Sequence, residues 1–170
     1  MRVIAIDPSL RSTGFAILER EDAYGAKVRA LEYGIVKNAA GLLGSSCLVA
    51  IRQRVSELVE RYRPDSAAVE AVIYVQSYRT AITLGAARGA ALVALAERGL
   101  AIFEYAPRSV KQSVVGRGGA GKEQVGFMVR ALLGLTETPQ ADAADALAIG
   151  LTHFQNHEAA KRGVGVLEQI

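Results

Sequence analysis

Residues 3–18 read VIAIDPSLRSTGFAIL, and this stretch decides the fold. Residues 3–6 are continuously apolar, which is typical of a central strand buried on both faces. Asp7 and Pro8 then open a turn. Residues 12–18 have the composition of a second strand, joined to the first by this short polar turn. The chain therefore opens on a buried strand that has an aspartate at its end.

The rest of the chain alternates between strand and helix patterns. We predict further strands at residues 28–36, 66–71 and 100–105, and helices at residues 46–63, 76–98, 107–115, 122–133 and 141–153. Elements in this order predict an α/β fold, in which helices cover a mixed sheet. We expect a single domain over residues 1–154, followed by a polar, mobile tail over residues 155–170.

Composition excludes several classes of protein. Hydrophobic residues make up 51% of the 170, which is enough for a full core, and the net charge of +3 permits a nucleic-acid partner without requiring one. The single cysteine, Cys47, cannot form an internal disulfide and is expected to be buried. Asp7 interrupts the short N-terminal apolar stretch, so no signal peptide is predicted, and the charges on Arg88 and Glu97 interrupt the most apolar helix. We expect a soluble cytoplasmic protein with no membrane partner.

Four carboxylates occupy positions that could bring them together. Asp7 ends the first strand, Glu70 lies near the end of the fourth, and Asp142 and Asp145 share one face of the last helix. Four carboxylates at close range require a cation, and ligands that are all oxygen favour Mg²⁺ or Mn²⁺. Two such ions would suit phosphoryl displacement. Taken singly, each acid also has an ordinary interpretation as a turn opener, a solubility charge or a helix cap.

The motifs along the chain resemble those of the RuvC family of Holliday-junction resolvases. The likeness covers residues 2–153 in the family's order, and its two most specific motifs lie near the C-terminus. The matching motifs are VIAIDPS with STG at residues 3–14, VE at 69–70, LGAARG at 84–89, VKQSVVG at 110–116 and QADAADALAI at 140–149.

This resemblance implies an RNase H-like fold and a homodimer that makes paired, symmetric nicks across a four-way DNA junction. The nicks would leave ends that a ligase can join. The resemblance makes Asp7, Glu70, Asp142 and Asp145 the metal-binding, catalytic acids, with two Mg²⁺ or Mn²⁺ ions per active site. The resemblance also implies that the protein acts together with a RuvA/RuvB branch-migration complex.

Basic residues concentrate in one segment of the chain. Residues 106–135 hold five cationic side chains against Glu123 alone, so this segment is more basic than the chain as a whole. A patch of this kind suits contacts with DNA phosphates, although a solvated surface is the ordinary alternative. Lys111 and Lys122 match the family's basic positions near the scissile phosphate. The residues predicted to contact DNA from this segment are Arg108, Lys111, Arg117 and Lys122.

Two places depart from the family pattern. Ser9 replaces the usual glycine after Asp7 and Pro8, which would cost strain only if that position needs a positive φ. Residues 71–74, AVIY, lack the usual polar residue after the acid. Tyr74 and Tyr78 could stack on unpaired bases at an opened junction, or could simply pack in the protein.

The small residues at 85–89, GAARG, predict close approach of another backbone on one face of their helix. Either the protein's own sheet or a second subunit could supply that backbone, and the family's dimer contact favours the second.

Two other functional interpretations, a phosphate-binding loop and a non-cleaving relative, are weaker, and His153 is given no catalytic role. Residues 116–122, GRGGAGK, fit the start of a phosphate-binding P-loop, but Glu123 stands where a serine or threonine is needed. A non-cleaving junction-binding relative of the same fold would lack one of the acids, and all four are present here. His153 lies more than two helical turns beyond Asp145, so we expect a surface histidine there.

Overall fold

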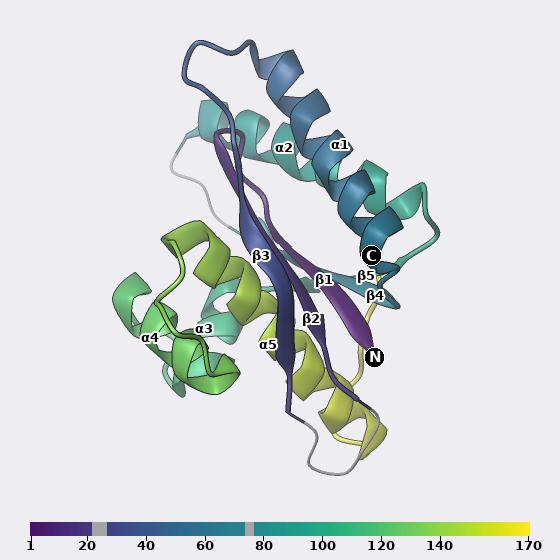
Figure 1. Cartoon of the computed structure of the whole chain (residues 1–170), viewed down its shortest axis with the longest axis vertical. Helices are drawn as coiled ribbons and strands as arrows, with labels where there is room; N and C mark the ends of the chain where they lie inside the picture. The colour runs from purple at the N-terminus through teal and green to yellow at the C-terminus, as the bar shows by residue number, and fades with distance from the viewer. Residues whose placement is uncertain (22–26, 74–76) are drawn as a thin grey trace.

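The computed structural model describes residues 1–21, 27–73 and 77–170, and in them a five-stranded sheet flanked by helices (Figure 1). The strands are β1 (Arg2–Asp7), β2 (Ser12–Glu19), β3 (Arg29–Lys37), β4 (Ser66–Glu70) and β5 (Ala101–Tyr105). The helices are α1 (Gly44–Tyr62), α2 (Tyr78–Ala96), α3 (Pro107–Val115), α4 (Lys122–Leu133) and α5 (Ala141–Lys161). No helix among these residues is both long and apolar enough to cross a membrane.

The sheet is mixed, and β1 lies at its centre. The strand order is β3-β2-β1-β4-β5; β2 runs antiparallel to its two neighbours, whereas β1, β4 and β5 are parallel. Residues 3–6 of β1 are fully buried, as the continuous apolar run predicts. Since parallel strands end at the same edge, the register that pairs Ile6 with Val69 sets Asp7 beside Glu70.

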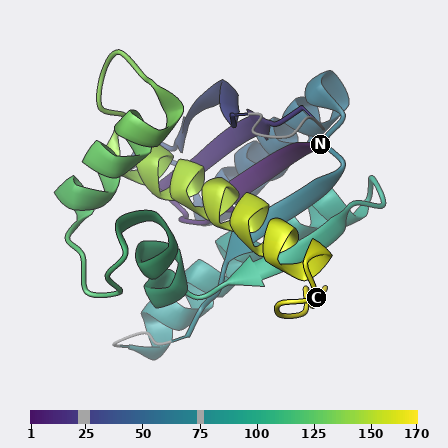
Figure 2. The ribbon, with the colours of Figure 1, turned by 90° about the horizontal axis from the view of Figure 1, so that it is seen from below.

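Helices cover both faces of the sheet. The sheet residues Ile4, Ile6 and Val69 pack in one core with α1 and α2, whereas Val3, Ala5 and Ala68 pack in a second core with α3, α4 and α5. Figure 2 shows α5 crossing its face of the sheet as a long diagonal, with α3 and α4 beside its N-terminal half. The strand ends and the start of α5 therefore meet on one side of the molecule.

Most element boundaries agree with the sequence prediction within two residues. Helix α1 begins at Gly44 rather than residue 46, and α2 begins at Tyr78 rather than residue 76. The later start of α2 has a physical cause, because the Ser77 side chain caps the helix by accepting a hydrogen bond from the Thr80 amide at 3.2 Å.

The predicted end of the last helix was wrong. Helix α5 continues to Lys161, so residues 155–161 are helical and do not belong to a tail. An ion pair at 2.6 Å between Arg20 and Glu158 ties this extension to the end of β2. The chain then returns to the sheet, where the amide of Ile170 donates to the carbonyl of Ile102 at 3.1 Å. The polar composition of this segment concealed these contacts.

Candidate active site

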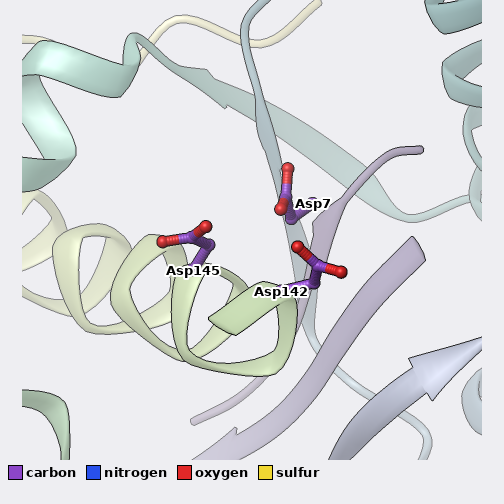
Figure 3. A group of neighbouring side chains, drawn as sticks. All are labelled: Asp7, Asp142 and Asp145. Atoms are coloured by element: carbon purple, nitrogen blue, oxygen red, sulfur yellow. The ribbon is translucent and has the colours of Figure 1, made fainter. Parts of the chain in front are cut away.

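Three aspartates meet at the edge of the sheet where β1 ends. Asp7 comes from β1, and Asp142 and Asp145 come from the first two turns of α5 (Figure 3). One carboxylate oxygen from each lies within 4.8 Å of the other two. This spacing suits divalent metal binding through oxygen ligands.

Glu70 completes the group from the neighbouring strand. It ends β4, one residue beyond the pair that Ile6 makes with Val69, and this places it beside Asp7. The negative charge of Glu70 raises the pKa of Asp7, and the negative charge of Asp145 raises the pKa of Glu70. The structure therefore brings together all four acids that the sequence singled out.

Gly14 allows α5 to begin this close to the sheet. It pairs with Asp7 across β1 and β2, and a Cβ atom built on it would lie 2.0 Å from the backbone carbonyl oxygen of Asp142. Only glycine leaves room for that backbone. From the same strand, the Ser12 hydroxyl donates a hydrogen bond to the Asp142 carboxylate. The role of Gly14 was not predicted from the sequence, although it lies within a motif that the sequence analysis quoted.

Burial and mutual repulsion make the site a poor environment for so much negative charge. Burial above all, and then the charges of Glu70 and the two α5 aspartates, raise the pKa of Asp7 to about 8. Burial likewise raises the pKa of Glu70 and the pKa of Asp145. A cation at the centre would remove this repulsion, and the all-oxygen donor set fits Mg²⁺ or Mn²⁺.

Lys122 supplies part of the missing positive charge. Its ammonium nitrogen, at the start of α4, lies 3.5 Å from Asp145 Oδ2 and 4.0 Å from Asp142 Oδ1. The charge of Asp145, above all, raises the pKa of Lys122. Lys111 on α3 is also close, because its positive charge acts to lower the pKa of Glu70 and the pKa of Asp145. The two lysines therefore border the acids, as their positions in the motifs predict.

The other predicted basic residues lie farther out on the same side. Arg108 is exposed on α3 and packs against Gly118, and Arg117 is exposed in the loop at residues 116–121. Gln112 fastens that loop, because its side-chain amide donates to the carbonyl of Gly116 at 2.7 Å and accepts from the amide of Gly118 at 3.0 Å. Composition alone did not indicate this role for Gln112.

Ser9 replaces the family's glycine without strain. Among the described residues, Arg63 is the non-glycine residue with a positive φ, so Ser9 is not in the left-handed region. Its backbone is tied to Thr13, whose hydroxyl donates to the Ser9 carbonyl at 2.5 Å.

Of the two tyrosines predicted to contact bases, Tyr74 lies outside the described residues. Tyr78 begins α2 and is 81% exposed, so it does not pack in the core. On the same helix, a Cβ atom built on Gly85 or Gly89 would meet nothing within 4 Å. The interpretation that these glycines approach the protein's own sheet is therefore wrong.

Cys47 and His153 are both buried, although the sequence predicted burial only for Cys47. Cys47 is fully buried in α1, as expected. His153 is also fully buried, so the prediction of a surface histidine was wrong. It faces the sheet, where Ser66 and Tyr105 offer hydrogen bonds that satisfy both ring nitrogens.

Comparison with known proteins decides the family of this chain. The sequence model of the family described as "Crossover junction endodeoxyribonuclease RuvC" matches residues 3–153. The chain belongs to the RuvC family. It is an endonuclease with the RNase H-like fold of that family.

Relatives in the RuvC family match over most of their length. RuvC of Akkermansia muciniphila is 56% identical over 154 residues, which cover 91% of this chain and 90% of the relative. RuvC of Trichlorobacter lovleyi is 43% identical over 93% of this chain and 87% of its own. The solved structure of Thermus thermophilus RuvC in complex with Holliday junction substrate is 36% identical, with a TM-score of 0.87 over 100% of this chain and 99% of that chain.

Proposed function

We propose that this chain resolves four-way DNA junctions by paired, symmetric nicks, using divalent ions held by Asp7, Glu70, Asp142 and Asp145. The observation that carries this proposal is the meeting of the four carboxylates, with Lys122 beside them, at the side of the sheet that bears the basic helices. Membership of a family of junction endonucleases, and the likeness to a relative solved with Holliday junction substrate, support the substrate.

The side chains of the site divide the work of hydrolysis. Two bound Mg²⁺ or Mn²⁺ ions would supply a water of lowered pKa and would offset the charge that develops on the phosphate. Asp7 holds a proton at neutral pH without a cation, because its pKa is about 8, and it would have to release that proton to act as a ligand of a divalent cation. Glu70, Asp142 and Asp145 would hold the ions from the other elements, so the geometry of the site depends on the packing of α5 on the sheet.

The basic side chains bind and orient the DNA backbone. Lys122 pairs with the aspartates of α5, and a divalent cation bound to those aspartates would free it to bind a phosphate oxygen beside the reacting group. Lys111 would bind from the neighbouring helix, α3. Arg108 and Arg117 are exposed farther from the acids. They would contribute contacts with DNA phosphates that do not depend on base sequence.

A homodimer on α2 would supply the second active site that paired nicks require. Tyr78, Ile82 and Val93 are all exposed on this helix, and they share one face with Gly85 and Gly89. Two copies of α2 could approach closely at the glycines and bury Ile82 and Val93, while Tyr78 at the start of the helix stays outside the contact. A twofold dimer of this kind matches the symmetry of a four-way junction. Tyr78 would then be free to stack on opened bases at the junction, and Tyr74 stays a second predicted base contact.

The cellular setting rests on the family alone. We place the protein in the cytoplasm and expect it to act with a RuvA/RuvB branch-migration complex, which would deliver junctions to it.

The test is a cleavage assay on a labelled, mobile four-way junction in Mg²⁺, with a linear duplex of the same sequence as control. The proposal predicts paired nicks in opposing strands that ligase seals, little cutting of the duplex, and no cutting by Asp7→Asn. Binding without cleavage by the wild type, in Mg²⁺ and Mn²⁺ and on junctions of varied sequence, would favour the non-cleaving junction-binding module.

A further inference from the structure

His153 lies at the centre of a buried polar bridge between α5 and the sheet. Its ring is fully buried, with Nδ1 2.7 Å from the Tyr105 hydroxyl and Nε2 3.0 Å from the Ser66 hydroxyl. The ring also packs on Phe103, with the centroids 4.9 Å apart. Burial lowers the pKa of His153 to about 4, so the imidazole is neutral at pH 7 and has one donor and one acceptor nitrogen.

The two hydroxyl groups satisfy the neutral imidazole in either tautomer. Burial raises the pKa of Tyr105 to about 12, so its hydroxyl keeps its proton and, like that of Ser66, can donate or accept a hydrogen bond. One ring nitrogen of His153 therefore donates and the other accepts, and the ring is held from two sides.

Similar lengths of β4 and α5 separate Ser66 and His153 from the acids. Tyr105, which pairs with Glu70 at the end of β5, instead contacts His153 from the acid end of the sheet. Ser66 begins β4 and Glu70 ends it, which is a separation of about 13 Å at roughly 3.3 Å per residue. On α5, Asp145 and His153 are eight residues apart, about 12 Å at 1.5 Å per residue. Because the two spans agree, α5 sets Asp145 near Glu70 when His153 is opposite Ser66.

Packing contacts also hold this face of α5 on the sheet. The buried residues in its first three turns include Leu147 and Ile149 as well as small residues such as Gly150, and the Asp142 carbonyl lies against Gly14. Apolar contacts are not directional. Hydrogen bonds are directional, so the bridge adds a defined position along the strand to these packing contacts.

We propose that His153 is a positioning residue for the metal site: through Ser66 of β4 and Tyr105 of β5 it fixes α5 along these strands and so sets Asp142 and Asp145 at the correct distance from Asp7 and Glu70. This inference rests on the proposed function, because it assigns the four acids to a metal. It adds a residue that touches neither metal nor DNA but determines how tightly the metal is held.

The test compares His153→Leu, which removes both hydrogen bonds, with Phe154→Leu as a matched control. Phe154 is the next residue of α5, is 1% exposed and packs in the same core, so its truncation weakens the helix without breaking the bridge. Two measurements are made at a temperature at which each variant is folded. The first is the Mg²⁺ concentration for half-maximal junction cleavage, and the second is the rise in melting temperature that Mg²⁺ produces without DNA.

His153→Leu should raise the Mg²⁺ midpoint about fivefold and reduce the Mg²⁺-induced rise in melting temperature, a smaller loss than the roughly 10- to 100-fold typical of groups that contact a metal ligand directly. Junction binding in EDTA should stay unchanged. Phe154→Leu should lower the melting temperature but leave the Mg²⁺ midpoint as in the wild type. His153→Gln, which keeps one donor and one acceptor, should recover part of the loss.

If His153→Leu does not fold, Tyr105→Phe and Ser66→Ala each break one link and should raise the midpoint in the same direction. A Mg²⁺ midpoint that is unchanged in the folded bridge variants, whatever their melting temperatures, would overturn the inference while leaving the proposed function intact. A wild type that neither cleaves junctions nor responds to Mg²⁺ would instead refute the proposed function.

Discussion

Gly14 and Asp142 lie in direct backbone contact, although 128 positions separate them in the sequence. The contact joins β2 to the first turn of α5, so the absence of a side chain at residue 14 determines where two of the four acids lie. Gly14 is also the strand partner of Asp7. One small residue therefore controls the distance between the acids of the sheet and those of the helix.

Replacing Gly14 by alanine should damage the site more than the fold. The added methyl group would clash with the Asp142 carbonyl oxygen, and overpacking of this kind costs about 1–3 kcal/mol of unfolding free energy. We expect lower stability in denaturant titration and loss of most junction cleavage. Gly44→Ala at the start of α1 is the control, because a Cβ atom there meets nothing within 4 Å. Equal activity in the two variants would contradict this role of Gly14.

Stability without metal should fall as pH rises, because of Asp7. Its pKa is about 8 in the folded protein against 3.8 for an ordinary aspartate, so between these values the folded state binds more protons than the unfolded state. In EDTA, the unfolding free energy of the wild type relative to Asp7→Asn should decrease from pH 4 to pH 8. With saturating Mg²⁺, which binds the ionised form, the wild type should instead gain stability over Asp7→Asn as pH rises. The measurement is urea unfolding at each pH, and a difference independent of pH in EDTA would refute the assignment.

Lys122 should matter for cleavage more than for folding. Lys122→Gln removes the ammonium group that lies 3.5 Å from the Asp145 carboxylate. An exposed ion pair of this kind contributes little to stability, about 0–1 kcal/mol. We expect a large drop in cleavage rate and a salt dependence of junction binding that is lower by about one phosphate contact. Arg130→Gln, in the last turn of α4, is the matched control and should keep the wild-type cleavage rate. A wild-type rate for Lys122→Gln would contradict the placement of this lysine at the scissile phosphate.

The exposed face of α2 should hold the dimer together. Ile82 is 67% exposed there, and Ile82→Glu would place a charge in the buried contact that we propose. Sedimentation should show a dimer for the wild type and a monomer for the variant, which should no longer make paired nicks. Val49→Glu on α1, where the side chain is 53% exposed, should leave the dimer unchanged. A monomeric wild type would refute the dimer.

The sequence predicted the four acids because each lies next to an element boundary that hydrophobic patterning locates well. Asp7 follows an apolar run, and Asp142 lies at the start of the last helix, so their meeting followed from the α/β architecture. Family motifs then assigned their roles. The distances between them depend on contacts such as that of Gly14, which periodicity does not encode.

The last helix shows why other features could not be predicted. Residues 155–161, QNHEAAK, are polar, and without the partner Arg20 for Glu158 they resemble a tail. His153 is polar by type, so its burial follows only from the hydroxyl groups of Ser66 and Tyr105, which are distant in sequence. In both cases a long-range polar partner overrides the local pattern.

Crystals of the protein soaked with Mn²⁺ would test the central assignment most directly, by anomalous scattering at the manganese edge. We predict two strong peaks among the carboxylates of Asp7, Glu70, Asp142 and Asp145, about 3.5–4 Å apart, and loss of at least one peak in Asp7→Asn. Peaks elsewhere with none among these acids, at Mn²⁺ concentrations that support cleavage in solution, would contradict the account.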